Sequence, residues 1–115
     1  MATNKPKNRV KAEKQRLLSL FAGIDENKRE VVLPLIDRAA FLRVALEDLE
    51  SEMLVEGFTE DYNNGQHQSG KKKSAAAQSH DAFTKNLNAI TKTLIDLVPP
   101  AQKAGAIEEL AARFA

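Results

Sequence analysis

Apolar residues recur every three or four positions along most of the chain, and no stretch of useful length alternates with a period of two. This spacing is typical of amphipathic helices. The longest such segment begins after Asp25, a favourable N-cap, and ends before Gly57, a favourable helix stop. Its apolar seam comprises Leu35, Ala39, Leu42, Leu46, Leu49 and Met53, and a second stripe comprises Val32, Ile36, Phe41, Val44 and Ala45. Pro34 lacks a backbone donor and disfavours helical geometry at Leu33, which predicts a kink or break there.

Three shorter helices are predicted around this segment. The first covers about residues 8–22, before Gly23. Another covers about residues 74–98 and is ended by two prolines. Its seam comprises Phe83, Leu87, Ile90, Leu94 and Leu97. The last covers residues 101–114 and is predicted to group Ala104, Ile107, Ala111 and Phe114 on one face. Residues 57–74 are polar and contain an Asn-Asn-Gly turn signal, so a loop is expected there.

The expected fold class is all-α, with a long antiparallel helical hairpin and short N- and C-terminal helices. It divides into a basic N-terminal arm and helix (1–24), a hairpin core (25–99, with the loop 57–74) and a C-terminal helix (100–115). The terminal helices are too short to cover the hairpin, which favours association between copies of the chain. The predicted oligomer interface comprises Leu35, Leu42, Leu46, Leu49, Met53, Phe83, Leu87, Ile90 and Leu94. A compact four-helix monomer is the alternative.

Composition narrows the class of protein. The chain has 115 residues and no cysteine, which indicates one domain and excludes disulfides and thiolate zinc sites. No apolar run is long enough to cross a bilayer, and none follows the basic N-terminus as in a secretory signal. We therefore expect a cytoplasmic protein that has no membrane partner.

Charge is distributed unevenly although the net charge is only +1. Residues 1–23 carry +5, whereas residues 25–56 carry nine acids and four bases, a balance of −5. The basic residues of the arm are Lys5, Lys7, Arg9, Lys11, Lys14 and Arg16. Such a surface can neutralise the phosphates of double-stranded DNA without reading sequence. Lys71, Lys72 and Lys73 form a second candidate DNA-binding surface. The alternatives are a solubilising terminus and a solvated loop.

No residue pattern indicates catalysis or a bound cofactor. Residues 65–71 match the spacing of a phosphate-binding loop, but Lys72 occupies the position of the Ser or Thr that holds magnesium. A polar segment precedes the match instead of a buried strand, so we interpret it as a chance match. His67 and His80 are the only histidines, and no cysteine accompanies them, so no metal site is predicted. We expect a protein that is not an enzyme.

Several short segments together resemble a known family. These are Ala40 with Phe41, 46–49 (LEDL), Gly57, 62–66 (YNNGQ), 70–74 (GKKKS) and 94–97 (LIDL) before the prolines. Over residues 14–99 the chain resembles small terminase subunits of tailed phages and prophages, in the group with a glycine-and-lysine loop between two helices. The resemblance implies a ring-forming, non-catalytic subunit. Such a subunit binds viral double-stranded DNA and presents it to a separate large terminase subunit, which carries the ATPase and nuclease.

The chain departs from that pattern in two places. No DNA-reading domain is evident, which puts recognition of a specific site in doubt. The tail after Pro100 differs from the usual ending, so the last helix is either a docking segment for the large subunit or a contact between copies. A helical adaptor or scaffold without a nucleic-acid role is the alternative function.

Overall fold

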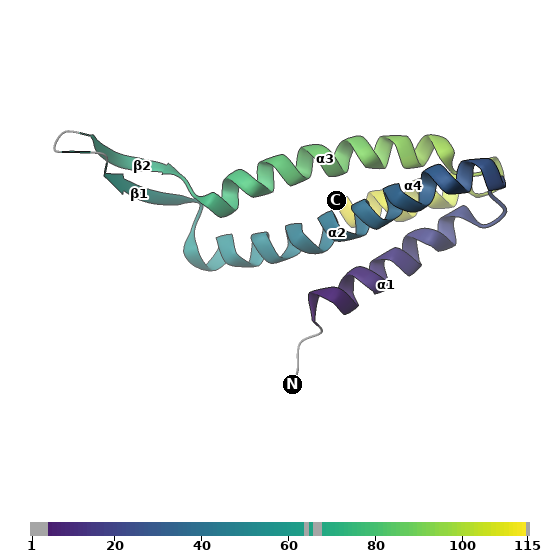
Figure 1. The fold of residues 1–115 in the computed structure, drawn as a ribbon, viewed down its shortest axis with the longest axis horizontal. Coiled ribbons are helices and arrows are strands. Elements are labelled where there is room, and N and C mark those ends of the chain that lie inside the picture. Colours follow the sequence, from purple (N-terminus) through teal and green to yellow (C-terminus); the bar gives the residue numbers. More distant parts are fainter. Residues whose placement is uncertain (1–4, 64, 66–67, 115) are drawn as a thin grey trace.

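The computed structural model describes residues 5–63, 65 and 68–114 and is mostly helical (Figure 1). Its elements are α1 (Pro6–Leu18), the 3₁₀ turn η1 (Ser19–Phe21), α2 (Glu26–Glu56), β1 (Thr59–Asn63), β2 (Ser69–Lys73), α3 (Ala75–Leu97), the 3₁₀ turn η2 (Pro100–Gln102) and α4 (Lys103–Phe114). The molecule is elongated, with extents of 62 × 35 × 24 Å. The predicted antiparallel hairpin is formed by α2 and α3, and α1 lies along α2 (Figure 1).

The ends of the long helices follow from local chemistry. The side chain of Asp25 accepts a hydrogen bond from the backbone N–H of Asn27 at 3.2 Å, and that of Ser74 accepts one from Ala77 at 3.1 Å. Both satisfy donors that an N-terminus leaves without helical partners. Gly57 ends α2 with φ +88° and ψ −179°, a conformation that is essentially restricted to glycine. The predicted bounds of α2 are therefore confirmed.

Pro34 does not break α2, which continues from Glu26 to Glu56. The proline ring removes the N–H that would bond to the carbonyl of Glu30, four residues earlier. Pro34 and Glu30 are both exposed, so water can satisfy that carbonyl. Of the two predicted outcomes, a kink or a break, the break does not occur, because the interruption falls on the solvent side of the helix.

The expected loop contains a β-hairpin, which corrects the all-α prediction. β1 and β2 pair antiparallel, with Asp61 opposite Lys71 and Tyr62 opposite Gly70. At the base, the backbone N–H of Ser74 donates to the carbonyl of Phe58 at 3.0 Å. Strands are usually recognised by alternating apolar residues that face a core. Both strands are largely exposed, so no such alternation was present to reveal them.

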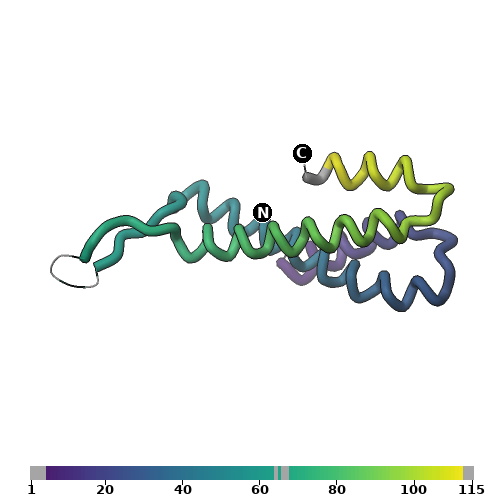
Figure 2. Tube along the Cα trace, turned by 90° about the horizontal axis from the view of Figure 1, so that it is seen from above, coloured from purple at the N-terminus to yellow at the C-terminus, as the bar shows by residue number. Residues whose placement is uncertain are grey.

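One hydrophobic core joins all four helices. The most deeply buried large side chains are Ile36, Leu94 and Val32. The core also takes Leu17 from α1 and Leu110 from α4. In Figure 2, α4 runs back beside α3 from the turn that follows the double proline. No described helix has the length and apolar character needed to span a bilayer.

The inward face of α4 differs from the prediction. Ala106 and Leu110 are buried, whereas Ala104, Ile107 and Ala111 are exposed. The side chain of Phe114 lies outside the described part of the chain. Ala106 and Leu110 are four positions apart, and Ala104, Ile107 and Ala111 are three and four positions apart. Both sets have helical spacing, so periodicity alone did not determine which of them faces α3.

The core also contains much of the predicted oligomer interface. The buried members are Leu42, Leu46, Met53, Leu87 and Leu94. The partly buried members are Leu35, Leu49, Phe83 and Ile90. The five buried members therefore pack within one chain, because side chains that are already covered have little surface left for a second copy. The seam spacing thus identified buried positions that other elements of the same chain cover.

Candidate nucleic-acid interface and contact surfaces

Three of the six basic residues of the predicted DNA-binding arm form ion pairs within the described chain. Arg9 donates to Asp48 at 2.6 Å and to Glu47 at 3.2 Å, both on α2. The hydrogen bond to Asp48 is the main reason why the pKa of Arg9 is raised above its ordinary value. Lys14 lies 2.8 Å from Asp37 of α2. The acidic helix therefore partly neutralises the basic one.

Arg16 differs because its ion pair lies within α1. Its guanidinium is 3.8 Å from the carboxylate of Glu13, whose side chain is buried against α2 with only 10% of its surface exposed. The Arg16 side chain remains 54% exposed. Part of its charge therefore stays accessible to solvent, although a carboxylate lies nearby.

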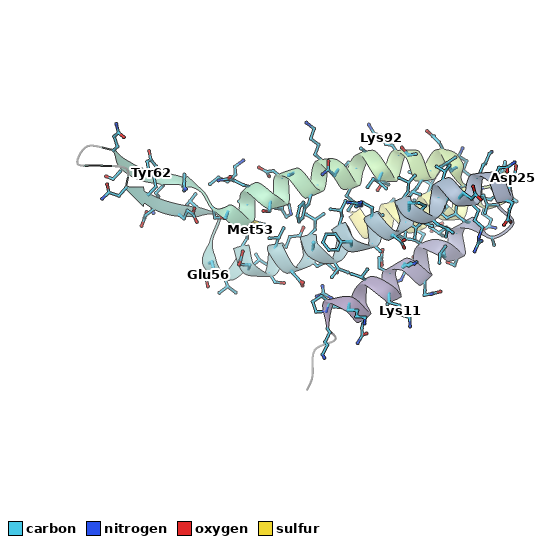
Figure 3. The ribbon with its side chains drawn as sticks, viewed as in Figure 1. Lys11, Asp25, Met53, Glu56, Tyr62 and Lys92 are labelled. Atoms are coloured by element: carbon cyan, nitrogen blue, oxygen red, sulfur yellow. The ribbon has the colours of Figure 1, made fainter. Side chains whose placement is uncertain are left out.

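Lys5, Lys7 and Lys11 remain available on α1 and at its N-terminus. All three are exposed, and none forms an ion pair with another residue of the described chain. Lys7 and Lys11 are one helical turn apart, so they share a side of α1. Figure 3 shows Lys11 on the outer side of that helix. These three lysines are the part of the predicted arm that can meet a phosphate without first breaking an ion pair.

The second predicted DNA-binding group, Lys71 to Lys73, lies on β2. Lys71 is 3.1 Å from Asp61, and Lys72 is 3.5 Å from Glu60 on β1. Lys73 donates to Asp81 of α3 and thereby lowers the pKa of that carboxyl below its ordinary value. Each of these lysines therefore has a carboxylate partner, although all three remain exposed.

The resemblance to a phosphate-binding loop is not matched by the geometry. Such a loop connects a strand to a helix, and its backbone N–H groups enclose the phosphates. Here Gly70 and Lys71 lie inside β2, and Tyr62 occupies the space above Gly70, 3.4 Å from where a Cβ would be. His67 lies outside the described residues. His80 is 2.9 Å from Glu50 of α2, and the described residues contain no group of side chains placed to hold a metal ion.

An apolar surface that was not predicted from the sequence lies where α2 meets the β-hairpin. Leu54 and Val55 are both 80% exposed, and Phe58 is 61% exposed. Phe58 also lines a surface depression of about 560 Å³ beside Met53 and Ala77. The sequence contained a sign of this surface in the three consecutive apolar residues 53–55. One face of a helix cannot bury three consecutive residues, so at least one of them is left exposed.

A second shallow depression follows the exposed side of the helical hairpin. Its lining includes Arg38, Phe41, Phe83 and Ile90, and its volume is about 420 Å³. Phe41 is 54% exposed, although it belongs to the second predicted apolar stripe. Phe83 and Ile90 are thus members of the predicted oligomer interface that do reach an exposed surface.

Comparison with known proteins supplies no relative. Neither a family model, nor a curated protein sequence, nor a solved structure matches this chain.

Proposed function

We propose that this chain is a non-catalytic DNA-packaging subunit of the small terminase kind. It associates with copies of itself, binds double-stranded viral DNA in the cytoplasm of the host cell and presents that DNA to a large terminase subunit. The observation that carries the proposal is the placement of Lys5, Lys7 and Lys11, which are exposed cations without carboxylate partners in the described chain. The segments that resemble the family over residues 14–99 supply the biological setting.

The DNA-binding part of the proposal follows from electrostatics. Binding of a lysine to a phosphate releases condensed counterions, so affinity falls as salt rises and does not depend on sequence. A lysine without a carboxylate partner can bind a phosphate without first losing an ion pair. Lys14 must first separate from Asp37, and Arg9 must separate from two carboxylates. The proposed DNA contacts are therefore made chiefly by Lys5, Lys7 and Lys11, with smaller contributions from the other predicted lysines and arginines.

Self-association is supported by apolar side chains that the chain itself leaves uncovered. Leu54 and Val55 are adjacent near the end of α2, Phe58 follows Gly57 beyond that end, and each of the three side chains is more than half exposed. Contiguous exposed apolar surface is typical of sites at which proteins associate. Phe41 adds a second uncovered aromatic side chain.

The DNA-binding test is a charge reversal with a matched control. Lys7→Glu with Lys11→Glu should weaken binding to duplex DNA at low salt and reduce the slope of log Kd against log salt by about two, since each phosphate contact contributes about one unit. Lys85→Glu with Lys92→Glu changes the net charge equally on exposed positions of α3 and should have a much smaller effect. Equal affinity for the parent chain and the α1 variant would exclude the proposed DNA contact.

The oligomer test is the solution mass by light scattering over a range of concentration. A closed oligomer whose mass does not change with concentration supports the packaging subunit. A monomer or simple dimer contradicts the ring that the family resemblance implies.

One observation favours a second function, a helical adaptor without a nucleic-acid role. Arg9 and Lys14 form ion pairs with acidic residues of α2, which neutralise part of the positive charge of the arm. An adaptor predicts no DNA binding even at low ionic strength, where phosphate contacts are strongest.

A further inference from the structure

The β-hairpin extends beyond the helical body. At its base Lys73 contacts Asp81 and Gln78 of α3, and the rest of its two strands is largely exposed. Figures 1 and 2 both show it continuing away from the end of α2 and α3. Nine of its ten strand residues are exposed, and β1 and β2 pair only with each other. Isolated two-stranded hairpins are only marginally stable in water. Each strand also has one outer edge whose backbone groups can accept a further strand.

Charge is segregated between the two strands. β1 carries Glu60 and Asp61 and no base, whereas β2 carries Lys71, Lys72 and Lys73 and no acid. The register places Glu60 opposite Lys72 and Asp61 opposite Lys71. Opposite charges directly across a pair of strands stabilise the pairing, and like charges destabilise it.

Because the charges are segregated, the outer edge of each strand favours an added strand of opposite charge. Lysines on an edge strand normally discourage pairing, and a second β2 would place lysine against lysine. Two β1 strands would likewise bring acids together. An approaching β1 instead offers Glu60 to Lys72 and Asp61 to Lys71, the same complementarity that the hairpin already contains.

We propose that β2 of one copy pairs antiparallel with β1 of a second copy of this chain, so that the hairpins form one sheet of alternating acidic and basic strands. The inference rests on the self-association included in the proposed function, but it does not depend on DNA binding. The contact joins two different edges, so it is heterologous and can continue from copy to copy until the geometry closes it.

The size of the helical body limits how successive copies are arranged. Two strands widen a sheet by about 10 Å, whereas the narrowest extent of the molecule is 24 Å. Adjacent strands are rotated by roughly 20–25°. This twist turns successive helical bodies away from one another around the sheet, which provides the space that the strand spacing alone does not.

The test uses two variants with hairpins of single charge. Glu60→Lys with Asp61→Lys makes both strands basic, and Lys71→Glu with Lys72→Glu makes both predominantly acidic. Each should associate with itself at least about tenfold more weakly than the parent chain, because like charges then face one another between copies. An equal mixture should restore association, since every intermolecular strand pair again joins opposite charges. Sedimentation velocity measures the masses, and far-UV circular dichroism checks that the helices are retained.

The mixture separates pairing between copies from pairing within a copy, because the hairpin of each variant remains internally mismatched. A chain that carries all four substitutions regains both complementarities and should associate like the parent. If the parent is an oligomer and neither variant changes its mass, the strand pairing is wrong while self-association stands. If the parent itself is a monomer, both the strand pairing and the proposed self-association are wrong.

Discussion

A guanidinium nitrogen of Arg9 lies 2.6 Å from a carboxylate oxygen of Asp48, a residue 39 positions further along the chain. A second nitrogen of the same group reaches Glu47 at 3.2 Å. This contact holds the basic α1 against the acidic α2. The opposite charges of the two segments are therefore used partly inside the molecule, and only the remainder is available to a partner.

The Arg9–Asp48 pair should contribute modestly to stability. Arg9→Gln should lower the free energy of unfolding by about 1 kcal/mol or less, because both partners are partly exposed to solvent. A double-mutant cycle with Asp48→Asn, measured by urea denaturation at low and high salt, isolates the pair and should show weaker coupling at high salt. Lys11→Gln is the control and should leave stability unchanged. Coupling that is indistinguishable from zero at low salt would contradict the contact.

Two leucines should respond differently to the same substitution. Leu94 is 1% exposed, so Leu94→Ala should cost about 2–5 kcal/mol through lost apolar burial and the cavity left behind. Leu54 is 80% exposed, so Leu54→Ala should change the stability of the monomer by no more than about 0.5 kcal/mol. Thermal or urea unfolding at low protein concentration measures both. A similar loss for the two variants would show that Leu54 is covered in solution.

Glycine should be required at the end of α2 but not within α4. Gly57 has φ +88°, so Gly57→Ala should destabilise the fold by about 1–3 kcal/mol through backbone strain. A Cβ on Gly105 meets no atom within 4 Å, so Gly105→Ala should instead stabilise by about 1 kcal/mol through helix propensity. Melting temperatures compare the two variants directly. Stabilisation by alanine at both positions would contradict the conformation of Gly57.

Asp81 should titrate below the usual range of an aspartate. Its hydrogen bond and charge interaction with Lys73 favour the carboxylate and lower its pKa in the folded chain. The pair therefore stabilises the fold above the ordinary pKa of about 3.9, and that contribution is lost as pH falls through the lowered value. Carboxyl ¹³C shifts followed by NMR should give a low midpoint for Asp81, and Lys73→Gln should raise it. Lys71→Gln, whose partner is Asp61, should leave it unchanged, and an ordinary midpoint in the parent chain would rule out the pair.

Local chemistry was sufficient to predict the helical hairpin. The N-cap Asp25, the helix stop at Gly57 and the seam spacing of α2 and α3 are properties of short segments, and each was readable from its own residues. The same holds for Leu42, Leu46, Leu87 and Leu94, whose spacing identified buried positions. The spacing did not show which surface covers these leucines. In the structure, other helices of the same chain cover them.

The tertiary structure decided the features that depend on distant neighbours. Ala106 and Leu110 are buried, rather than Ala104 and Ile107, and this depends on how α4 is oriented against α3 after η2. The strands of the hairpin bury no apolar face, so only their pairing with each other reveals them.

The charges of the chain were determined partly by the sequence and partly by the tertiary structure. The sequence by itself determined that residues 1–23 carry +5 and residues 25–56 carry −5. Which of these charges form ion pairs was decided only by the packing of α1 on α2. Arg9 pairs with Asp48 and Glu47, and Lys14 pairs with Asp37. Lys11 instead faces solvent. The physical reason is distance: a charge interaction between segments depends on which faces meet in the folded chain, and composition does not contain that information.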